Sequence, residues 1–580
     1  GSRAQGVVSA EMTVEKTFAN LMRSWADRRP ELDVLTFDLG DEGRDEIRTY
    51  AELWANGNRI AAALIANGMR PGDRFAIMLR NHPEFIEAMI AASITGTVFA
   101  AIDPRTKGAK LAFTLNDAGC RGIICADYSI GQVADVRDML PLLEWVWLLD
   151  AEKADAEEVT GCVPMSAILS EPQVWITPRS SAVDVLQITY TSGTTGDPKG
   201  AVRTNQYYGG PGVVGELFGF SPDDRPYTGL SLTHGAALNI IIQPALGFGQ
   251  RAVVSRKFTK SRLWDITRRY ECSYFMMLGG IATALFSEPE RPGDADNPVR
   301  FVISAGMPTA LWDRFEKRFG VDILEMYGAT EGGFTYKPAR LGPVGSFGKQ
   351  ATTGPSPALT MLVVDENDRE CAPGELGELV WRPIDGEPAS IVYWNNPETS
   401  ARKTRGGWMR TGDICHRDED DWLFFDHRMG DGIRRNGDFI NPGLVESALA
   451  SSQQVDDAFV YGVVCSHNSP GESEVVAAIV LAADAAFDAI DLIDHCEREL
   501  ERSALPSYFQ IVDQIPKTAS EKPQARFLRD ELVQEIAAVC ATNGSGVGKT
   551  LTWPERQNLF ATSAVAQPAN TRVVSGKVAQ

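Results

Sequence analysis

A glycine-rich segment at residues 190–200 carries residue types that bind phosphate. Its sequence, YTSGTTGDPKG, sets three glycines among four serine and threonine hydroxyls and one lysine. Glycine lets the backbone approach a ligand closely, and hydroxyls, backbone N–H groups and an ammonium donate hydrogen bonds to phosphate oxygens. An apolar run at 183–188, typical of a strand, precedes the segment. A flexible hairpin does not require this order of residues, so the segment predicts a phosphate-binding loop.

A second stretch rich in glycine, 544–550, also contains a lysine followed by a threonine. A Walker A loop needs a glycine where this chain has Asn543, and it needs a preceding strand. The residues before the stretch, 531–541, have helical character instead. We therefore assign no nucleotide site to it.

Apolar periodicity predicts the elements that must position the phosphate loop. Up to about residue 175, segments with helical spacing alternate with short apolar runs, a pattern that indicates βαβ units. The expected helices are 50–67, 82–95 and 491–503, and the expected strands are 74–79, 98–102, 301–304, 323–326, 458–464 and 475–481, with a β-rich region at 374–391. The chain is therefore predicted to be an α/β protein.

Composition along the chain predicts its division into segments. The leading Gly1-Ser2 is interpreted as a cloning remnant ahead of a flexible N-terminus. A stretch dense in glycine and charge, 426–437, predicts a domain boundary near residue 428, and the last residues lack apolar periodicity, which predicts a flexible tail. The four expected segments are 1–14, 15–428, 429–535 and 536–580.

Overall composition narrows the classes of function. The 580 residues include 77 acidic and 56 basic side chains, a formal net charge of -21, which argues against broad binding of nucleic acid or anionic membranes. The nine cysteines form no C-x-x-C pair or zinc-ligand cluster, so we expect reduced, mostly buried thiols. Neither a long apolar run nor a signal-peptide pattern occurs, which predicts a cytoplasmic protein without integral membrane association. A homodimer is left open.

Three further motifs follow the loop in the sequence. They are SAGMP at 304–308, YGATEG at 327–332 and WMRTGD at 408–413. Together with the loop they resemble the motifs of the adenylate-forming superfamily, which comprises acyl-CoA synthetases, nonribosomal adenylation domains and luciferases. The resemblance spans about residues 15–535. It implies a large N-terminal domain of several subdomains, a small mobile α+β C-terminal domain, and ATP- and Mg²⁺-dependent adenylation of a carboxylic acid.

The resemblance assigns the glycine-rich loop to the terminal phosphates of ATP, and it assigns residues of the SAGMP and YGATEG motifs to the adenine base. The turn Gly306-Met307-Pro308 receives adenine, with Met307 in place of the usual small residue. The ring of Tyr327, followed by Gly328, stacks on adenine. The loop residues implied to close over the β- and γ-phosphates are Thr191, Ser192, Gly193, Thr194, Thr195, Gly196 and Lys199.

The remaining polar residues of the motifs are implied to bind the α-phosphate, the metal and the sugar. Thr330 meets the α-phosphate, and Glu331 holds Mg²⁺, which prefers hard oxygen ligands. Asp413 accepts both ribose hydroxyls, because each carboxylate oxygen can take one O–H. Arg428 reaches the ribose and the phosphate.

The segment IPKTASEK at 515–522 resembles the family motif that ends in the catalytic lysine. Lys522 is implied to bridge the attacking carboxylate and the α-phosphate, where a cation reduces their repulsion, although Glu521 replaces a usual glycine. Gly430 stands at the family hinge, so the C-terminal domain is expected to rotate between two half-reactions. For the second half-reaction, Gly437 matches a glycine of the coenzyme A channel and His234 a position between that channel and the acyl pocket.

The acyl pocket is implied to be lined mainly by small residues. This composition favours a medium- or long-chain or ring-bearing acid over acetate. Transfer to a carrier-protein thiol, a luciferase-like reaction with oxygen and a non-catalytic nucleotide-binding homologue remain alternatives to transfer to CoA. The pocket residues are Gly235, Ala236, Gly279, Gly280, Gly332 and Gly333.

Overall fold

A computed structural model of the chain describes most of its length. The described residues are 15–40, 43–151, 161–191, 198–329, 332–349, 359–429, 433–435, 438–463, 473–500, 504–517, 523–532 and 571–575. Contacts divide the chain into two compact units. The first contains residues 1–191, 197–223 and 238–256, and the second contains 192–196, 224–237 and 257–580. Within the described residues, no helix is long and apolar enough to cross a membrane.

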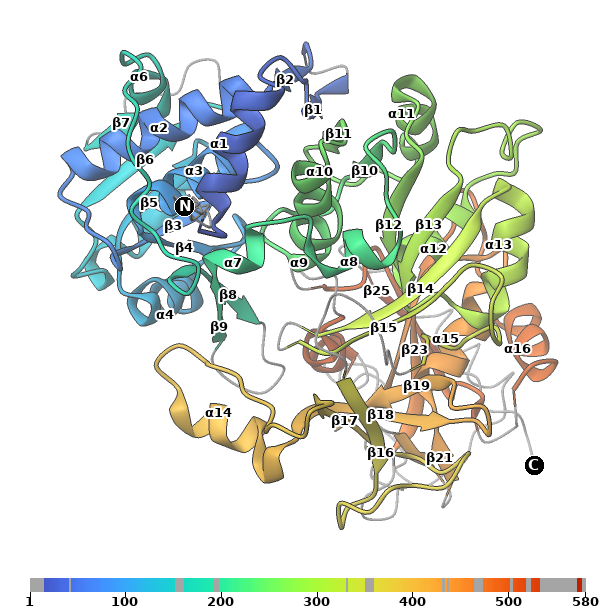
Figure 1. Cartoon of the computed structure of the whole chain (residues 1–580). Helices are drawn as coiled ribbons and strands as arrows, with labels where there is room; N and C mark the ends of the chain where they lie inside the picture. Colours follow the sequence, from blue (N-terminus) through green and yellow to red (C-terminus); the bar gives the residue numbers. More distant parts are fainter. Residues whose placement is uncertain are drawn as a thin grey trace, which may run out of the picture. The chain divides into compact units, whose positions relative to one another are not determined.

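The first unit is built around a seven-stranded sheet in the order β7-β6-β5-β3-β4-β8-β9, drawn in blue to teal in Figure 1. All neighbours pair in parallel except β8 and β9. The strands are β3 (Arg74–Met78), β4 (Val98–Ala101), β5 (Cys120–Ala126), β6 (Trp145–Leu149), β7 (Cys162–Pro164), β8 (Val185–Thr191) and β9 (Lys199–Thr204). Parallel neighbours need crossover connections, which the intervening helices supply.

The helices of this unit confirm the predicted periodicity. Helix α2 (Tyr50–Ala66) begins with a capping box from Thr49 and Glu52, and α3 (Pro83–Thr95) ends at Gly96 in the left-handed conformation. Three short strands pair in the order β11-β1-β2. The remaining elements are α1 (Phe18–Arg28), β1 (Leu35–Asp38), β2 (Glu46–Arg48), α4 (Gly108–Ala118), α5 (Ile130–Asp135), η2 (Arg137–Met139), α6 (Met165–Leu169), α7 (Asn205–Tyr208), α8 (Gly212–Leu217), the π-helical η3 (Leu238–Ile242), α10 (Gln243–Phe248) and β11 (Ala252–Ser255).

The second unit begins with strands in the order β15-β14-β13-β12-β10, of which only the β14–β15 pair is antiparallel. The strands are β10 (Pro226–Thr228), β12 (Tyr274–Leu278), β13 (Phe301–Ala305), β14 (Asp322–Gly328) and β15 (Phe334–Lys337). The helical segments among them are α9 (Gly235–Ala237), α11 (Leu263–Tyr270), α12 (Gly279–Ser287), η4 (Thr309–Leu311) and α13 (Trp312–Phe319). Strands β13 and β14 confirm the predictions at 301–304 and 323–326.

A four-stranded antiparallel sheet follows, in the order β16-β17-β18-β19, drawn in yellow and orange in Figure 1. Its apolar core includes Leu379, Met409 and Cys415. Strand β17 confirms the β-rich region predicted at 374–391. The elements are β16 (Leu359–Val364), β17 (Gly377–Pro383), α14 (Pro397–Lys403), η5 (Arg405–Gly407), β18 (Met409–Arg417) and β19 (Leu423–Arg428).

The C-terminal elements form a mixed sheet, β22-β23-β24-β25, and a two-stranded hairpin, β20-β21. Strands β22 and β23 confirm the predictions at 458–464 and 475–481. The elements are β20 (Ile433–Arg435), β21 (Asp438–Ile440), α15 (Pro442–Ala450), β22 (Val455–Val463), β23 (Glu474–Leu481), α16 (Ala489–Glu497), β24 (Tyr508–Val512) and β25 (Thr571–Ser575).

Strand β25 lies within the segment 536–580, for which a flexible tail stays a prediction. Residues 571–575 pair antiparallel with β24. Threonine and valine favour extended backbone, and an edge strand offers unpaired N–H and C=O groups. The predicted boundary near residue 428 stays a prediction, because residues 430–432 lie outside the described part of the chain.

Candidate functional site

The predicted nucleotide-binding residues that the structure describes gather mainly in the second unit. In the first unit, Lys199 begins β9 and its backbone is paired with that of Thr191 at the end of β8, which places both at the ends of the predicted phosphate loop. The site residues that lie outside the described residues are Ser192, Gly193, Thr194, Thr195, Gly196, Thr330, Glu331, Gly430, Gly437 and Lys522.

Asp413 is the best-defined polar group of the site. It lies in β18, is only 6% exposed and pairs in register with Arg428 of β19. The Tyr327 hydroxyl donates to its Oδ2 at 2.6 Å, and the Arg428 Nε lies 3.2 Å from its Oδ1. Both carboxylate oxygens are therefore fixed in direction. A carboxylate held in this way can accept two O–H groups of a vicinal diol.

Tyr327 connects Asp413 to the strand β14. Burial, and then the Asp413 carboxylate, raise the pKa of Tyr327 well above its usual value, so the phenol keeps its proton and acts as the donor. Its ring lies 4.9 Å from the ring of Phe347, at an interplanar angle of 34°. The structure thus brings together Tyr327, Asp413 and Arg428, and their roles toward the nucleotide stay predictions. Stacking of Tyr327 on adenine stays a prediction.

The Gly306-Met307-Pro308 turn follows β13 and is fixed by a residue that the sequence analysis did not identify. Gly306 has a φ of 87°, which only glycine adopts readily. The N–H groups of Gly306 and Met307 both donate to the Glu325 carboxylate, the second at 3.2 Å. Glu325 stands two residues before Tyr327 in β14. An acidic residue inside the apolar run Ile323-Leu324-Glu325-Met326 was the available signal.

Glu325 gives a testable dependence of stability on pH. It is 4% exposed, and burial raises its pKa from 4.5 to about 7 although the turn's N–H groups lower it. When folding raises the pKa of a carboxyl group, that group stabilises the folded state at pH values below its pKa in the unfolded chain. This contribution to the unfolding free energy is lost as the pH rises through about 7. The free energy of unfolding of the wild type should therefore fall, relative to Glu325→Gln, between about pH 4.5 and 7.

Urea unfolding of both proteins at pH 5 and pH 8 measures this difference. Other buried acids, such as Glu84, whose pKa is also raised to about 7, are the same in both proteins and cancel. A difference in unfolding free energy that is equal at the two pH values would contradict the assignment.

Four of the five glycines of the predicted acyl pocket are closely packed against neighbouring atoms. A Cβ at Gly279 would lie 2.4 Å from the Gly306 carbonyl oxygen, and one at Gly333 would lie 2.4 Å from the Trp381 indole nitrogen. At Gly332 it would approach Trp381 at 3.2 Å, and at Gly280 it would approach Lys517 Nζ at 2.8 Å. The missing side chains therefore make room for protein atoms, so these positions give no measure of the space left for an acid.

His234 precedes α9 and is half-buried. The backbone N–H of His234 donates to the Ser231 carbonyl at 3.0 Å, and the ring Nδ1 of His234 accepts from the backbone N–H of Ala236 at 3.2 Å. A nitrogen that accepts a hydrogen bond carries no proton, so this arrangement holds the ring with any N–H on Nε2. His234, Gly235 and Ala236 thus form one local turn.

Residues on both sides of 518–522 are held in place near the acyl-pocket glycines. Lys517 and Pro523 form an antiparallel bridge, and Lys517 makes an ion pair with Asp457 of β22. The Lys517 ammonium also lies against Gly280, at the start of α12. The residues that flank Lys522 therefore lie beside a predicted pocket residue within the second unit.

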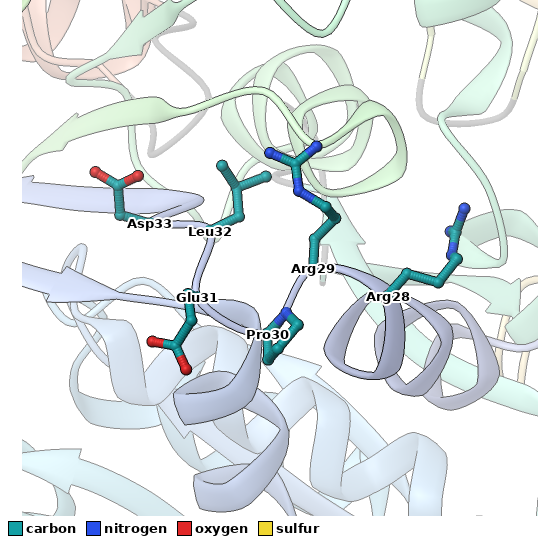
Figure 2. A pocket seen from close by; sticks show the side chains of 6 residues that line it. All are labelled: Arg28, Arg29, Pro30, Glu31, Leu32 and Asp33. Atoms are coloured by element: carbon teal, nitrogen blue, oxygen red, sulfur yellow. The ribbon is translucent and has the colours of Figure 1, made fainter.

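Neither a metal-binding cluster nor the hollow at residues 28–33 offers a competing site among the described residues. No cluster of three or more His, Cys, Asp or Glu residues suited to a metal occurs among them. The hollow shown in Figure 2 lies in the first unit and is lined by consecutive residues from Arg28 to Asp33. None of the predicted site residues lines it.

The ribose assignment of Asp413 predicts the effect of removing its charge. We expect Asp413→Asn to raise the KM for ATP about 10- to 100-fold, since a hydrogen bond to a charged group contributes roughly 1.5–3 kcal/mol. Initial rates at varied ATP measure the change, with the exposed Asp385→Asn as control. An unchanged KM for ATP would remove Asp413 from the nucleotide site.

Comparison with known proteins adds independent findings. Sequence profiles of the AMP-binding enzyme and of the AMP-binding enzyme C-terminal domain match residues 22–385 and 444–522. A medium/long-chain-fatty-acid–CoA ligase of Mycobacterium marinum is 28% identical over 509 residues, covering 86% of this chain and 95% of the relative. The 2-succinylbenzoate–CoA ligase of Bacillus subtilis is 26% identical over 522 residues, covering 89% and 99%. The anthranilate CoA ligase AuaEII in complex with anthranoyl-AMP has a TM-score of 0.79 at 22% identity, covering 90% of this chain and 98% of that one.

Proposed function

Because this chain belongs to the AMP-binding enzyme family, we propose that it is an ATP-dependent, AMP-forming acid:CoA ligase. The observation that carries the proposal is the set of Tyr327, Asp413 and Arg428. It provides a fixed carboxylate for a ribose, with a guanidinium next to it that can reach a phosphate. Both profile matches, one of them to the C-terminal domain that carries Lys522, support the same reaction.

The reaction consists of two half-reactions. In the first, an oxygen of the substrate carboxylate forms a bond to the α-phosphorus of ATP, and pyrophosphate leaves with the electrons of the broken P–O bond. In the second, the CoA thiol loses its proton and forms a bond to the acyl carbon, and AMP leaves. Magnesium supplies charge neutralisation of the phosphates when bound. No enzyme nucleophile takes part in either step.

The chain's own residues bind ATP, orient the reacting groups and neutralise their negative charge. Asp413 holds the ribose, the Gly306–Pro308 turn receives the base, and Arg428 faces sugar and phosphate. The loop residues from Thr191 to Lys199 hold the terminal phosphates, and Glu331 holds the metal. Lys522 places a positive charge between the carboxylate and the α-phosphate, where two anions must meet. Positioning of reactants in this way supplies a large part of the rate.

The substrate proposed for this reaction is a medium- or long-chain or ring-bearing carboxylic acid. Proteins similar to the chain are ligases of medium- and long-chain fatty acids, of 2-succinylbenzoate and of anthranilate. Acid-dependent exchange of pyrophosphate into ATP, measured over fatty, aromatic and alicyclic acids and acetate, identifies the class. Exchange with acetate or propionate alone would refute the proposed substrate class, and absence of exchange with every acid would refute adenylation.

Location and assembly are also proposed. We place the enzyme in the cytoplasm, because the seven described cysteines that the structure records as free form no disulfide. A homodimer is proposed for the assembly, and sedimentation at several protein concentrations tests it. A single species at the mass of one 63.2 kDa chain would exclude the dimer.

A further inference from the structure

Asp413 lies in an irregular part of strand β18. Its neighbour strand β17 pairs Glu378 with Ile414 and Val380 with Arg410, so residues 411–413 face a single residue, Leu379. Gly412 within this bulge has a φ of 74°. A bulge removes local ladder hydrogen bonds, and bulges often redirect a side chain next to a binding site. Here the bulge sets the direction of the Asp413 side chain.

Side chains supply the hydrogen bonds that the ladder lacks at the bulge. The Gly412 N–H donates to Glu378 Oε1 at 3.0 Å. Thr411 Oγ1 accepts from the Asp413 N–H at 3.1 Å and donates to the Leu379 carbonyl at 2.6 Å. The Gly412 carbonyl accepts from the Met429 N–H at 2.7 Å. The backbone at Asp413 is therefore held largely by contacts outside the ordinary ladder.

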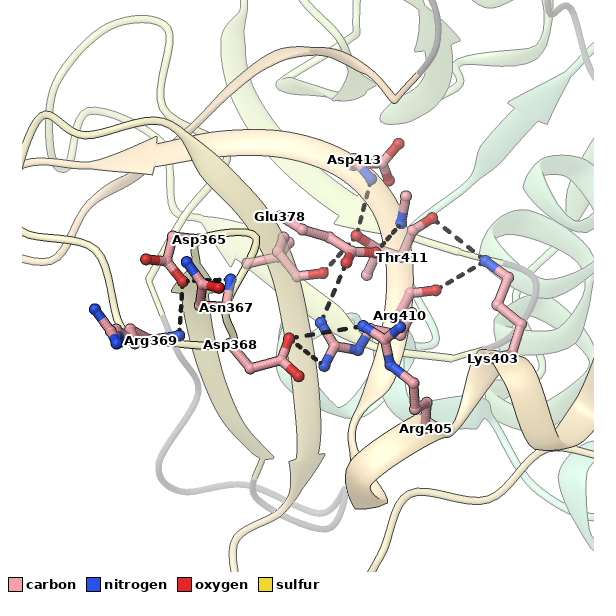
Figure 3. Close-up of polar contacts among 12 residues, drawn as sticks. Asp365, Asn367, Asp368, Arg369, Glu378, Lys403, Arg405, Arg410, Thr411 and Asp413 are labelled. Atoms are coloured by element: carbon pink, nitrogen blue, oxygen red, sulfur yellow. Dashed lines mark hydrogen bonds and ion pairs between the residues drawn. The ribbon is translucent and has the colours of Figure 1, made fainter.

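Lys403, the last residue of α14, completes this set of contacts (Figure 3). Its Nζ donates to the carbonyl of Arg410 at 2.8 Å and to that of Thr411 at 3.4 Å. Both carbonyls belong to buried residues, which are 9% and 5% exposed. A buried carbonyl without a donor is costly, and hydrogen bonds from an ammonium are stronger than neutral ones. Lys403 thus fixes the two peptide groups that lead into the bulge.

The positive charge of the nearby Arg410 is balanced by two acidic side chains and not by contacts with the main chain. The Arg410 guanidinium lies 2.6 Å from Asp368 and 3.3 Å from Glu378. Figure 3 shows this guanidinium directed toward the two acids, while the Lys403 ammonium approaches the main chain from the helix side. The ammonium of Lys403 therefore acts on the backbone of β18 and does not duplicate the role of Arg410.

From these contacts we propose that Lys403 is a positioning residue for recognition of the nucleotide ribose. It holds the bulge in the shape that presents the Asp413 carboxylate to the 2′- and 3′-hydroxyls. The inference rests on the proposed function, because it takes Asp413 as the ribose ligand. Loss of the ammonium leaves the carbonyls of Arg410 and Thr411 without this donor, so the bulge relaxes and Asp413 turns away from the diol.

The test compares the binding of ATP with that of 2′,3′-dideoxy-ATP, which lacks both hydroxyls. Dissociation constants are measured by calorimetry with Mg²⁺, without acid or CoA, so that no turnover is required. We expect Lys403→Met to weaken ATP binding about tenfold while dideoxy-ATP binding changes less than about twofold. Lys403→Arg should retain the preference for ATP. The matched control is Arg402→Met, an exposed residue of the same helix.

Asp413→Asn separates failure of this inference from failure of the proposed function. If Asp413→Asn abolishes the preference for ATP, and adding Lys403→Met to it causes no further loss, the two residues act as one unit and the inference holds. Equal weakening of both nucleotides by Lys403→Met, or no weakening of either, overturns the role of Lys403. A wild-type preference that survives Asp413→Asn overturns the nucleotide site itself.

Discussion

Replacement of Lys522 by alanine is expected to abolish acid-dependent release of pyrophosphate and to leave transfer from supplied acyl-AMP to CoA largely intact. In the proposed function the ammonium acts only where the carboxylate and the α-phosphate meet, and removal of one group that stabilises developing charge costs about 100- to 1,000-fold in rate. Lys517 and Pro523, which flank Lys522 in the sequence, form an antiparallel bridge, and the Lys517 ammonium lies against Gly280. Two assays, pyrophosphate release and acyl-CoA formation from the adenylate, measure the steps separately.

Lys549→Ala is the matched control for this variant. Lys549 lies in the glycine-rich stretch of the tail to which no nucleotide site is assigned, so its loss should leave both steps unchanged. An equal loss of both steps in Lys522→Ala would show that Lys522 supports the whole fold or both reactions, and its assignment to adenylation would then be wrong.

Gly430→Pro is expected to have the opposite effect, sparing adenylation and blocking thioester formation. Proline fixes φ near −65°, and a conformation that proline cannot adopt costs about 3 kcal/mol or more. This corresponds to roughly 100-fold in the step that needs the rotation. Single-turnover formation of acyl-AMP, followed by addition of CoA, measures the two steps in one experiment.

Gly293→Pro controls for the general effect of proline in a turn. Gly293 follows Pro292, has open space around its Cα, and does not need a positive φ. Both half-reactions should proceed normally in this variant. If Gly430→Pro forms acyl-CoA from acyl-AMP at the wild-type rate, residue 430 is not the hinge.

Local patterns of the sequence predicted many elements of the fold. The helix at 50–67 and the strands at 74–79 and 98–102 were found within a few residues, because apolar spacing and end residues such as Thr49 determine them locally. The order β7-β6-β5-β3-β4-β8-β9 could not be predicted in this way, since it depends on contacts between distant segments. The pairing of β25 with β24 depends likewise on an edge about 60 residues away.

The polar residues of the site were predictable only where a motif named them. Asp413, Arg428 and Tyr327 stand in or near motifs, and the structure brings them together. Glu325 and Lys403 act on main-chain groups, and such contacts leave no spacing pattern in a sequence, although the acidic Glu325 inside an apolar run was one signal. The bulge at 411–413 is also invisible in the sequence, because it is defined by register against β17.

The glycines of the predicted acyl pocket show why composition alone does not measure the space that is left for an acid. A glycine can leave a cavity or allow close packing, and the sequence does not distinguish the two. Gly279 and Gly333 allow close approach of the Gly306 carbonyl and of Trp381. The size of the acid must therefore be determined by experiment.

The most direct test of the account is a product analysis of the purified protein with ATP, Mg²⁺, an acid that supports pyrophosphate exchange, and CoA. Chromatography of nucleotides and thioesters should show AMP, pyrophosphate and acyl-CoA in equal amounts, with acyl-AMP accumulating when CoA is omitted. Formation of ADP and phosphate, or consumption of ATP without acyl-CoA when CoA is present, would contradict an AMP-forming acid:CoA ligase.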